Sequence, residues 1–164
     1  MMANFSPQEI VRIAIKVEET GEKLYAKLEY KATDEQIKEV WGYLRGQEHT
    51  HREVFQRMLD NIGDYIVDNF NPGEYDTYLR AIASEYVFTS EMIERKSKEG
   101  FPNDLAAIKF GIDIEKESVL VYETMREFVA LERHEILDKV IKEEKKHLTL
   151  LIGLKASLKK EKGE

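Results

Sequence analysis

Cysteine is absent from this sequence of 164 residues, and proline is scarce, with three residues. Without cysteine the chain can form neither a disulfide framework nor a thiolate metal site. Long hydrophobic runs are absent too, because charged residues interrupt every apolar stretch well before the roughly 18 residues that a membrane span needs. The N-terminus has neither the positive nor the apolar segment of a signal peptide. We therefore expect a cytoplasmic protein that does not insert into membranes.

The chain also lacks an excess of positive charge. It has 25 Lys and Arg residues against 32 Asp and Glu residues, a formal net charge of −7, and both signs are spread along its length. A protein that binds a nucleic-acid backbone needs a clustered basic face, so nucleic acid is not an expected partner. The length suits one domain with a core of its own, and we expect residues 1–164 to form a single domain.

Helical periodicity of the apolar residues dominates the sequence, and no alternating pattern bounded by turn residues indicates a strand. The predicted fold class is therefore all-α. Capping signals predict the helix starts at Ser6 with Pro7, at a capping box that opens with Thr33, and at Asn103 or Asp104. The predicted helices cover residues 7–31, 34–60, about 75–99, 104–129 and 131–159. An irregular connection precedes the helix over 75–99, Gly100 ends it, and the tail from residue 159 is expected to fray.

Residues 104–159 repeat the pattern of residues 7–60. The first helix matches the helix over 104–129 after a shift of 97 positions, and the second matches the helix over 131–159 after a shift of 96. The shared polar positions are Glu18 and Glu115, Tyr25 and Tyr122, Glu48 and Glu144, and His51 and His147. A two-helix unit used twice predicts a four-helix bundle with pseudo-twofold symmetry, and the helix over 75–99 lies in the connection between the two copies.

Six polar side chains occupy helix stripes that the periodicity assigns to the core: Glu18, Glu48, His51, Glu115, Glu144 and His147. Burying four unpaired carboxylates together is costly, because each loses its hydration and all repel one another. The stripes contain no Lys or Arg, so two divalent cations are expected to balance the four carboxylates. One Glu from each of two helices and a Glu-x-x-His pair from each of the other two form the ligand set of di-iron and di-manganese bundles. The sequence therefore predicts a dinuclear metal site.

Other polar and aromatic residues are given structural or surface roles, with one alternative left open. Tyr25 and Tyr122 either support the metal-bound carboxylates through hydrogen bonds or are core aromatic residues. Trp41 is expected to pack in the core. The remaining candidates are predicted to lie on the surface: His49, His134, Glu85, Glu91, Glu19, Glu22, Glu117 and Glu143.

With these motifs the chain resembles the rubrerythrin-type members of the ferritin-like superfamily. The resemblance covers the four bundle helices, and it is carried by Glu18, the Glu48/His51 pair, Glu115 and the Glu144/His147 pair. It implies a non-haem di-iron centre in which Glu48 and Glu144 bridge the metals, Glu18 and Glu115 are terminal, and each metal has one histidine. It also implies that these four carboxylates are the catalytic groups and that hydrogen peroxide or dioxygen is the oxidant.

The chain departs from that family in two ways. Rubrerythrins carry a rubredoxin domain whose four cysteines hold an electron-transfer iron, and this chain has no cysteine. Electrons must therefore come from a separate donor protein. Family members also supply a further Glu three residues after the one at Glu115, and here that position is Ser118. The expected ligand set therefore has six members.

Several functions remain open at this point. The leading hypothesis is reduction of hydrogen peroxide or dioxygen in defence against oxidative stress. The alternatives are ferritin-like iron oxidation and sequestration, or a bundle whose metal only stabilises the fold. Two iron ions are expected, but the ligand types do not separate iron from manganese or zinc. The long connection over residues 60–103 predicts a homodimer, with exchange of helices between subunits as one of its forms.

Overall fold

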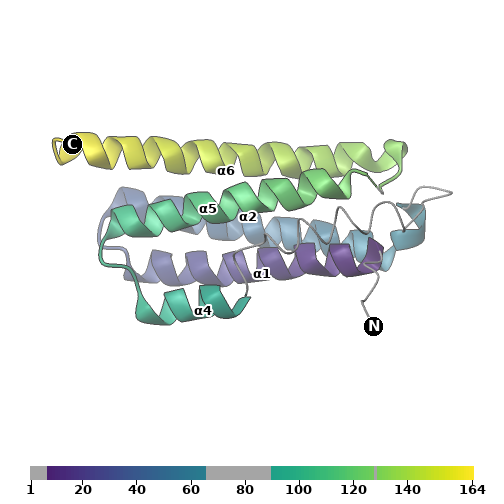
Figure 1. Ribbon diagram of the computed structural model, residues 1–164, viewed down its shortest axis with the longest axis horizontal. Helices are drawn as coiled ribbons and strands as arrows, with labels where there is room; N and C mark the ends of the chain where they lie inside the picture. The colour runs from purple at the N-terminus through teal and green to yellow at the C-terminus, as the bar shows by residue number, and fades with distance from the viewer. Residues whose placement is uncertain (1–6, 66–89, 128) are drawn as a thin grey trace.

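The computed structural model of the chain describes residues 7–65, 90–127 and 129–164. These residues form four long helices, one shorter helix and two 3-10 turns (Figure 1). In chain order they are α1 (Pro7–Lys31), α2 (Glu35–Asp60), η1 (Ile62–Asp64), α4 (Ser90–Glu99), α5 (Asp104–Met125), η2 (Leu131–Arg133) and α6 (His134–Glu161). The all-α prediction is confirmed.

The helix starts follow local capping chemistry. Helix α1 begins at Pro7, as predicted, while Ser6 lies outside the described residues. The cap of α2 is Asp34, whose carboxylate accepts the Ile37 N–H at 3.0 Å, so the capping box opening at Thr33 was placed one residue early. Of the two candidates for α5, Asn103 is the cap, and its side chain accepts the Ala106 N–H at 2.9 Å.

Three predicted helix ends are wrong by a few residues. Helix α5 ends at Met125 rather than about residue 129, because the chain turns there and the Ala130 N–H donates to the Tyr65 carbonyl oxygen at 2.6 Å. Helix α6 begins at His134, after η2, and stays helical to Glu161 where fraying was expected. Helix α4 ends at Glu99, as predicted, and the φ of 76° at Gly100 favours glycine there. The first part of the predicted helix over 75–99, including Glu85, lies outside the described residues.

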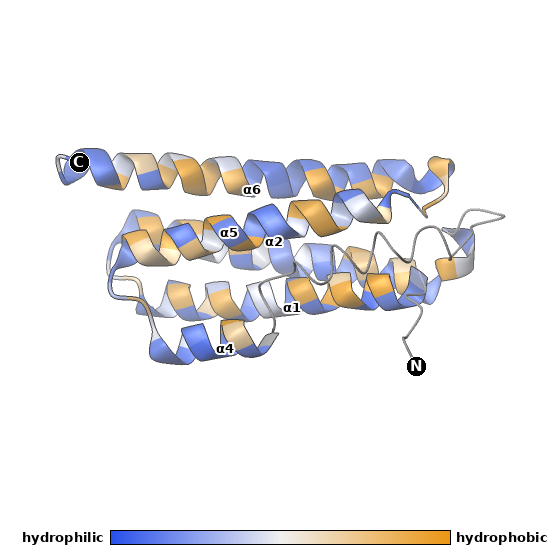
Figure 2. Ribbon diagram, viewed as in Figure 1, coloured by the Kyte–Doolittle hydropathy of each residue, from blue (hydrophilic) through white to orange (hydrophobic). Residues whose placement is uncertain are grey.

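The four long helices pack as two pairs, with α1 along α2 and α5 along α6, and α4 lies against α1 (Figure 1). Hydrophobic residues recur along these helices at helical spacing (Figure 2). They form two separate apolar clusters. One includes Val11, Phe55 and Leu137, and the other includes Leu24, Trp41 and Leu151. On α1 and α2, these clusters lie on either side of Glu18 and Glu48, so the candidate metal ligands occupy a polar layer between two apolar ones.

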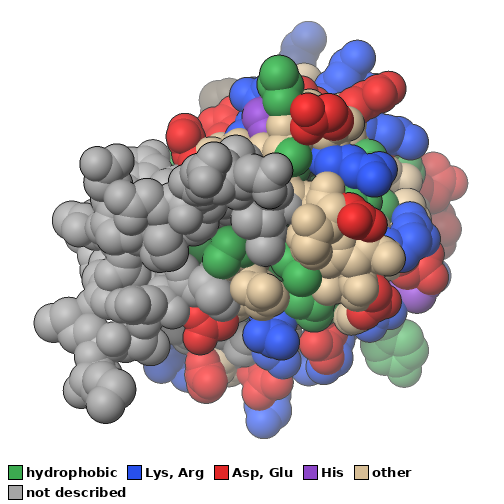
Figure 3. All heavy atoms as spheres, turned by 90° about the vertical axis from the view of Figure 1, so that its right-hand side faces the viewer, with side chains coloured by type: hydrophobic (Ala, Val, Ile, Leu, Met, Phe, Trp, Pro, Cys, Tyr) green, Lys and Arg blue, Asp and Glu red, His purple; other side chains and the backbone are tan. Residues whose placement is uncertain are grey.

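The surface carries charge of both signs. At the end of the bundle where α5 leads into α6, acidic and basic side chains are interspersed over the described surface (Figure 3). This agrees with the even charge distribution in the sequence. None of the described helices is both long enough and apolar enough to cross a lipid bilayer.

Candidate metal centre

The six predicted side chains meet in the polar layer at the middle of the bundle. Glu18 comes from α1, Glu48 and His51 from α2, Glu115 from α5, and Glu144 and His147 from α6. Each is at most 2% exposed. Because each Glu-x-x-His pair spans about one helical turn, its two side chains point to the same side of the helix. Four helices thus place six side chains of metal-ligand type in the same layer of the bundle.

These side chains form two groups that could each hold one ion. One group consists of Glu18, Glu48, His51 and Glu144, and the other of Glu48, Glu115, Glu144 and His147. Within each group one potential ligand atom per residue lies within 4.8 Å of all the others. Glu48 and Glu144 belong to both groups, as two bridging carboxylates would. This arrangement is consistent with two adjacent cation positions, with one histidine at each.

Unsatisfied polar atoms give an independent test of whether these residues suit a metal. Among the described residues, eight buried side-chain nitrogen and oxygen atoms have no hydrogen-bond partner, and all eight belong to these six residues. Buried polar atoms are normally paired, because leaving one unpaired costs about 1–3 kcal/mol. The His51 Nδ1 lies 2.6 Å from Glu144 Oε1, yet neither atom has a hydrogen-bond partner. Divalent cations with carboxylate and imidazole ligands would satisfy this set.

Two tyrosines orient the carboxylates that belong to only one group. The Tyr25 hydroxyl donates to Glu115 Oε1 at 2.5 Å, and the Tyr122 hydroxyl donates to Glu18 Oε1. In both glutamates the second oxygen, Oε2, has no partner. Each tyrosine therefore occupies one carboxylate oxygen and leaves the other available to a cation. Of the two alternatives for these residues, the supporting hydrogen bond is the one observed.

The two histidines differ in their support. The Nε2 of His51 lies 2.9 Å from a carboxylate oxygen of Glu143, so Nε2–H donates to that carboxylate and Nδ1 is left free to bind a cation. Neither ring nitrogen of His147 has a partner among the described residues, although its ring meets that of Tyr43 edge to face at 5.9 Å. The centre is therefore less symmetrical than the sequence repeat.

Glu143 was predicted to be an exposed residue, and that prediction was wrong. Its side chain is 28% exposed and reaches His51 on the neighbouring helix. Helical register places Glu143 at the edge of the inward stripe but does not show how far a long side chain reaches. Its counterpart in the first repeat is Gln47, so the repeat gave no signal for it either.

Burial and mutual repulsion favour protonated carboxyls in the metal-free centre. Burial, opposed in part by hydrogen bonds, raises the pKa of Glu18 to about 8. Burial and the charges of neighbouring carboxylates raise the pKa of Glu48 and of Glu144 well above the ordinary value. Burial would also raise the pKa of Glu115, but neighbouring groups, His147 foremost, hold it below its usual value.

The supporting groups keep the protonation states that a metal site needs. Burial lowers the pKa of His51, although Glu143 opposes this, so the ring stays neutral and can act as a ligand. Burial and nearby carboxylates raise the pKa of Tyr25 and of Tyr122 well above 10. Both phenols therefore remain protonated and keep donating to their glutamates.

Two small residues at equivalent positions of the repeat shape the space beside the carboxylates. At Gly21 an added Cβ would lie 2.8 Å from Glu48 Oε2, so only glycine allows this close approach. Its counterpart is Ser118, which is buried and donates its hydroxyl to the Ile114 carbonyl oxygen of its own helix. Ser118 therefore has its hydrogen bond within α5 and is absent from both candidate cation groups.

The other residues singled out in the sequence lie away from the centre. His49 is half exposed and lies 3.1 Å from Glu22 Oε1. His134 is partly buried and contacts the Val129 carbonyl oxygen at 2.7 Å. Trp41 packs in the core, as predicted. The acidic residues predicted to be exposed differ in burial: Glu91 is exposed, while Glu19, Glu22 and Glu117 are partly buried.

Comparison with known proteins agrees with this geometry. The family model described as Rubrerythrin matches residues 9–155. A crystal structure from Thermotoga maritima, of a protein provisionally described as a ferritin-like diiron-carboxylate protein, superposes with a TM-score of 0.67 at 24% sequence identity. The match covers 95% of this chain and 98% of that one, and shows that the two share a fold. No curated protein matches the sequence significantly.

Proposed function

Since the chain belongs to the rubrerythrin family, we propose that it is a di-iron oxidoreductase that reduces hydrogen peroxide, or dioxygen, with electrons from a separate donor protein. The observation that supports this most strongly is the pair of buried ligand groups that share Glu48 and Glu144. Two adjacent cations in a dry site suit a two-electron reaction, because each can give up one electron. A site for one cation, or an exposed acidic cluster, would not have this property.

The proposed ligand assignment follows the two groups. Glu48 and Glu144 would bridge the two ions, Glu18 and His51 would complete one, and Glu115 and His147 would complete the other. The bound ions would supply the electrons and the Lewis acidity of the reaction. The four carboxylates, with a charge of −4, would neutralise the +4 of two divalent ions. The buried bundle interior therefore acquires no net charge from the pair.

The protein's own side chains position these groups and exclude water. Tyr25 and Tyr122 hold one oxygen each of Glu115 and Glu18 and so fix the direction of the other oxygen. Glu143 fixes the ring of His51. The two apolar clusters close the layer on both sides and keep bulk water from the centre. Such support increases metal affinity and holds the ligands in place before the reaction begins.

The test is anaerobic loading with Fe(II) followed by addition of hydrogen peroxide. A peroxidase consumes one peroxide for every two Fe(II) oxidised and turns over repeatedly when a reductant is supplied. An iron-sequestering protein would keep accumulating iron beyond the two sites in a multi-subunit particle. A bundle with only structural metal would consume no peroxide. Size-exclusion chromatography on the same sample distinguishes the proposed homodimer from a cage.

A further inference from the structure

We propose that electrons enter the centre through Trp41 and Tyr25, from an acidic electron-carrier protein that docks on a lysine-lined face where α1, α4, α5 and α6 meet. This inference rests on the proposed function, because it identifies where the external donor would bind. The sequence predicted only that such a donor is required. The docking face and the route inward come from the ring contacts, the cavities and the charges described next.

A continuous chain of contacts links the surface to the centre. The rings of Trp41 and Tyr25 are stacked, with centroids 5.5 Å apart and planes at 18°. The Tyr25 hydroxyl in turn donates to Glu115 Oε1 at 2.5 Å. Gly111 on α5 lies beside the indole, since a Cβ at this position would be in ordinary van der Waals contact with Trp41 Cη2, at 3.4 Å. The stacked rings and the hydrogen bond form a short path of direct contacts, so they offer an electron a tunnelling route through the apolar layer.

The equivalent tyrosine on the other side of the centre has a different aromatic neighbour in the described part of the chain. Tyr122 donates to Glu18 just as Tyr25 donates to Glu115, but its ring lies against Phe55, with centroids 4.8 Å apart. The chain contains a single tryptophan, and it stands beside Tyr25. Among the described residues the two tyrosines therefore differ: Tyr25 is stacked on a ring that lines a cavity, whereas Tyr122 contacts Phe55, which lines neither of the cavities described next.

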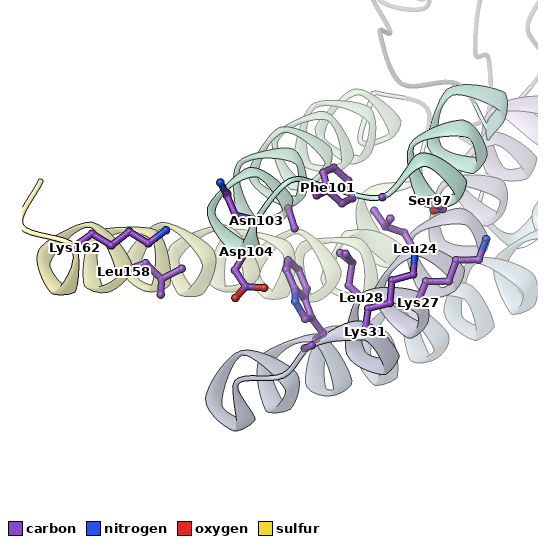
Figure 4. A pocket seen from close by; sticks show the side chains of 14 residues that line it. Leu24, Lys27, Leu28, Lys31, Ser97, Phe101, Asn103, Asp104, Leu158 and Lys162 are labelled. Carbon is purple, nitrogen blue, oxygen red and sulfur yellow. The ribbon is translucent and has the colours of Figure 1, made fainter.

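The outer end of this route is a cavity. Trp41 lines a cavity of about 280 Å³ at the end of the bundle near the C-terminus of α1, although only 1% of the residue is exposed. Lys27 and Lys31 on α1 lie on one side of this cavity, and Lys162 lies on the other (Figure 4). Asp104 is the acidic residue of the lining. A carrier seated there would be separated from Glu115 by two rings.

Positive charge extends beyond this cavity over the docking face. A second cavity, of about 460 Å³, shares Leu24, Lys27 and Ser97 with the first. Together the two linings contain six lysines and two acidic residues, although the whole chain has a net charge of −7. The six are Lys16, Lys23, Lys27, Lys31, Lys98 and Lys162. Glu19 neutralises part of this charge through Lys16 and Lys23. The excess of lysine favours a partner with an acidic face.

The electron balance is simple. Each docked carrier is oxidised by one electron, and one ion of the centre is reduced by one electron. Two such transfers supply the two electrons that, with two protons, convert one hydrogen peroxide to two waters. The electron tunnels along Trp41 and Tyr25, and neither ring changes its oxidation state. The hydroxyl proton of Tyr25 stays shared with Glu115.

The kinetic experiment uses the iron-loaded, oxidised protein and a reduced plant-type ferredoxin, an acidic carrier with a two-iron, two-sulfur cluster. Stopped-flow absorbance gives the half-saturating ferredoxin concentration and the limiting rate of its oxidation. Trp41→Phe should lower the limiting rate of ferredoxin oxidation, while the half-saturating ferredoxin concentration stays the same. Reversing Lys27 and Lys31 to Glu should raise that concentration roughly tenfold at low salt, because electrostatic steering is lost. The matched control reverses Lys139 and Lys142 on the other half of α6 and should leave it unchanged.

A second readout does not depend on iron. In the zinc-loaded protein labelled with nitrogen-15, Trp41 gives one indole N–H signal, and oxidised ferredoxin, which is unlabelled, should shift that signal. The inference is overturned if the lysine reversals and their control behave alike, if Trp41→Phe reduces as fast as the wild type, or if a second copy of the chain covers the cavity. Peroxide turnover that survives all these variants would retain the proposed function and reject the route. Fast reduction of the metal centre by ferredoxin without peroxide turnover would support the route and reject the proposed function.

Discussion

Glu48 and Glu144 differ from the other two carboxylates because each belongs to both candidate cation groups. Both oxygens of Glu144 are buried without a hydrogen-bond partner, and burial with nearby charge raises its pKa well above the ordinary value. Glu18 and Glu115 each spend one oxygen on a tyrosine. Of the four carboxylates, Glu144 is therefore the one that hydrogen bonds stabilise least in the metal-free protein.

Replacing Glu144 should therefore raise the stability of the metal-free protein and at the same time abolish metal binding. Glu144→Leu removes a buried polar group that has no hydrogen-bond partner and should stabilise the metal-free protein by about 1–3 kcal/mol, the cost of leaving such a group unpaired. It should also abolish binding of both metals. Urea unfolding and elemental analysis measure the two effects. Glu39→Leu changes an exposed glutamate of α2 and serves as the control. A Glu144→Leu protein that still binds two metals would refute the bridging role.

The pH dependence of the metal-free protein follows from Glu18. Its pKa is raised from 4.5 to about 8, so the folded state holds this proton more tightly than the unfolded state. Its contribution to stability is complete below pH 4.5 and is lost as the pH rises to about 8. Added Mn(II) should stabilise more as the pH rises, because the ligands must lose protons to bind it. Thermal midpoints at about pH 6 and about pH 8, with and without Mn(II), measure both trends. A metal-free midpoint that rises over this interval would contradict the account.

At the scale of the helices, the sequence predicted most of the architecture because periodicity and repeat carry it. The stripes on the bundle helices located all six buried groups, since a shared register places equivalent residues at one level. Helix ends were less predictable, because α5 ends where Ala130 pairs with Tyr65, a contact between distant segments. Glu143 was missed for a related reason: its contact with His51 depends on the distance between α2 and α6.

Close approach of α1 and α2 at Gly21 gives a prediction at this scale. Gly21→Ala places a Cβ 2.8 Å from Glu48 Oε2, so the carboxylate must move and metal affinity should fall. The helix itself should gain up to about 1 kcal/mol from alanine. Gly153→Ala on α6 is the matched control, since no atom lies within 4 Å of its added Cβ and only the helix gain is expected. Competition with a metal chelator and thermal unfolding measure the two effects, and equal affinities in both variants would show that Gly21 is not needed.

For the whole molecule, the centre is where the two helix pairs are joined. Each candidate cation group draws residues from both pairs, so bound metal would link α1 and α2 to α5 and α6. Removing the metal leaves buried polar atoms without partners in the same layer. Chelation should lower the thermal midpoint and speed amide exchange most in the turns of α2 and α6 around His51 and His147. Hydrogen exchange measured by mass spectrometry locates the change, and uniform acceleration along the chain would argue against a linking role.

The most direct test of the central claim is the number of metals bound per chain. Anaerobic titration with Fe(II), read by absorbance and elemental analysis, should saturate at two irons per chain in the wild type. Glu18→Ala should retain one, because Glu18 belongs to a single group, and the double variant Glu48→Ala with Glu144→Ala should retain none. Saturation at one iron or fewer in the wild type, or two irons bound by the double variant, would contradict the claim that these six residues form a dinuclear centre.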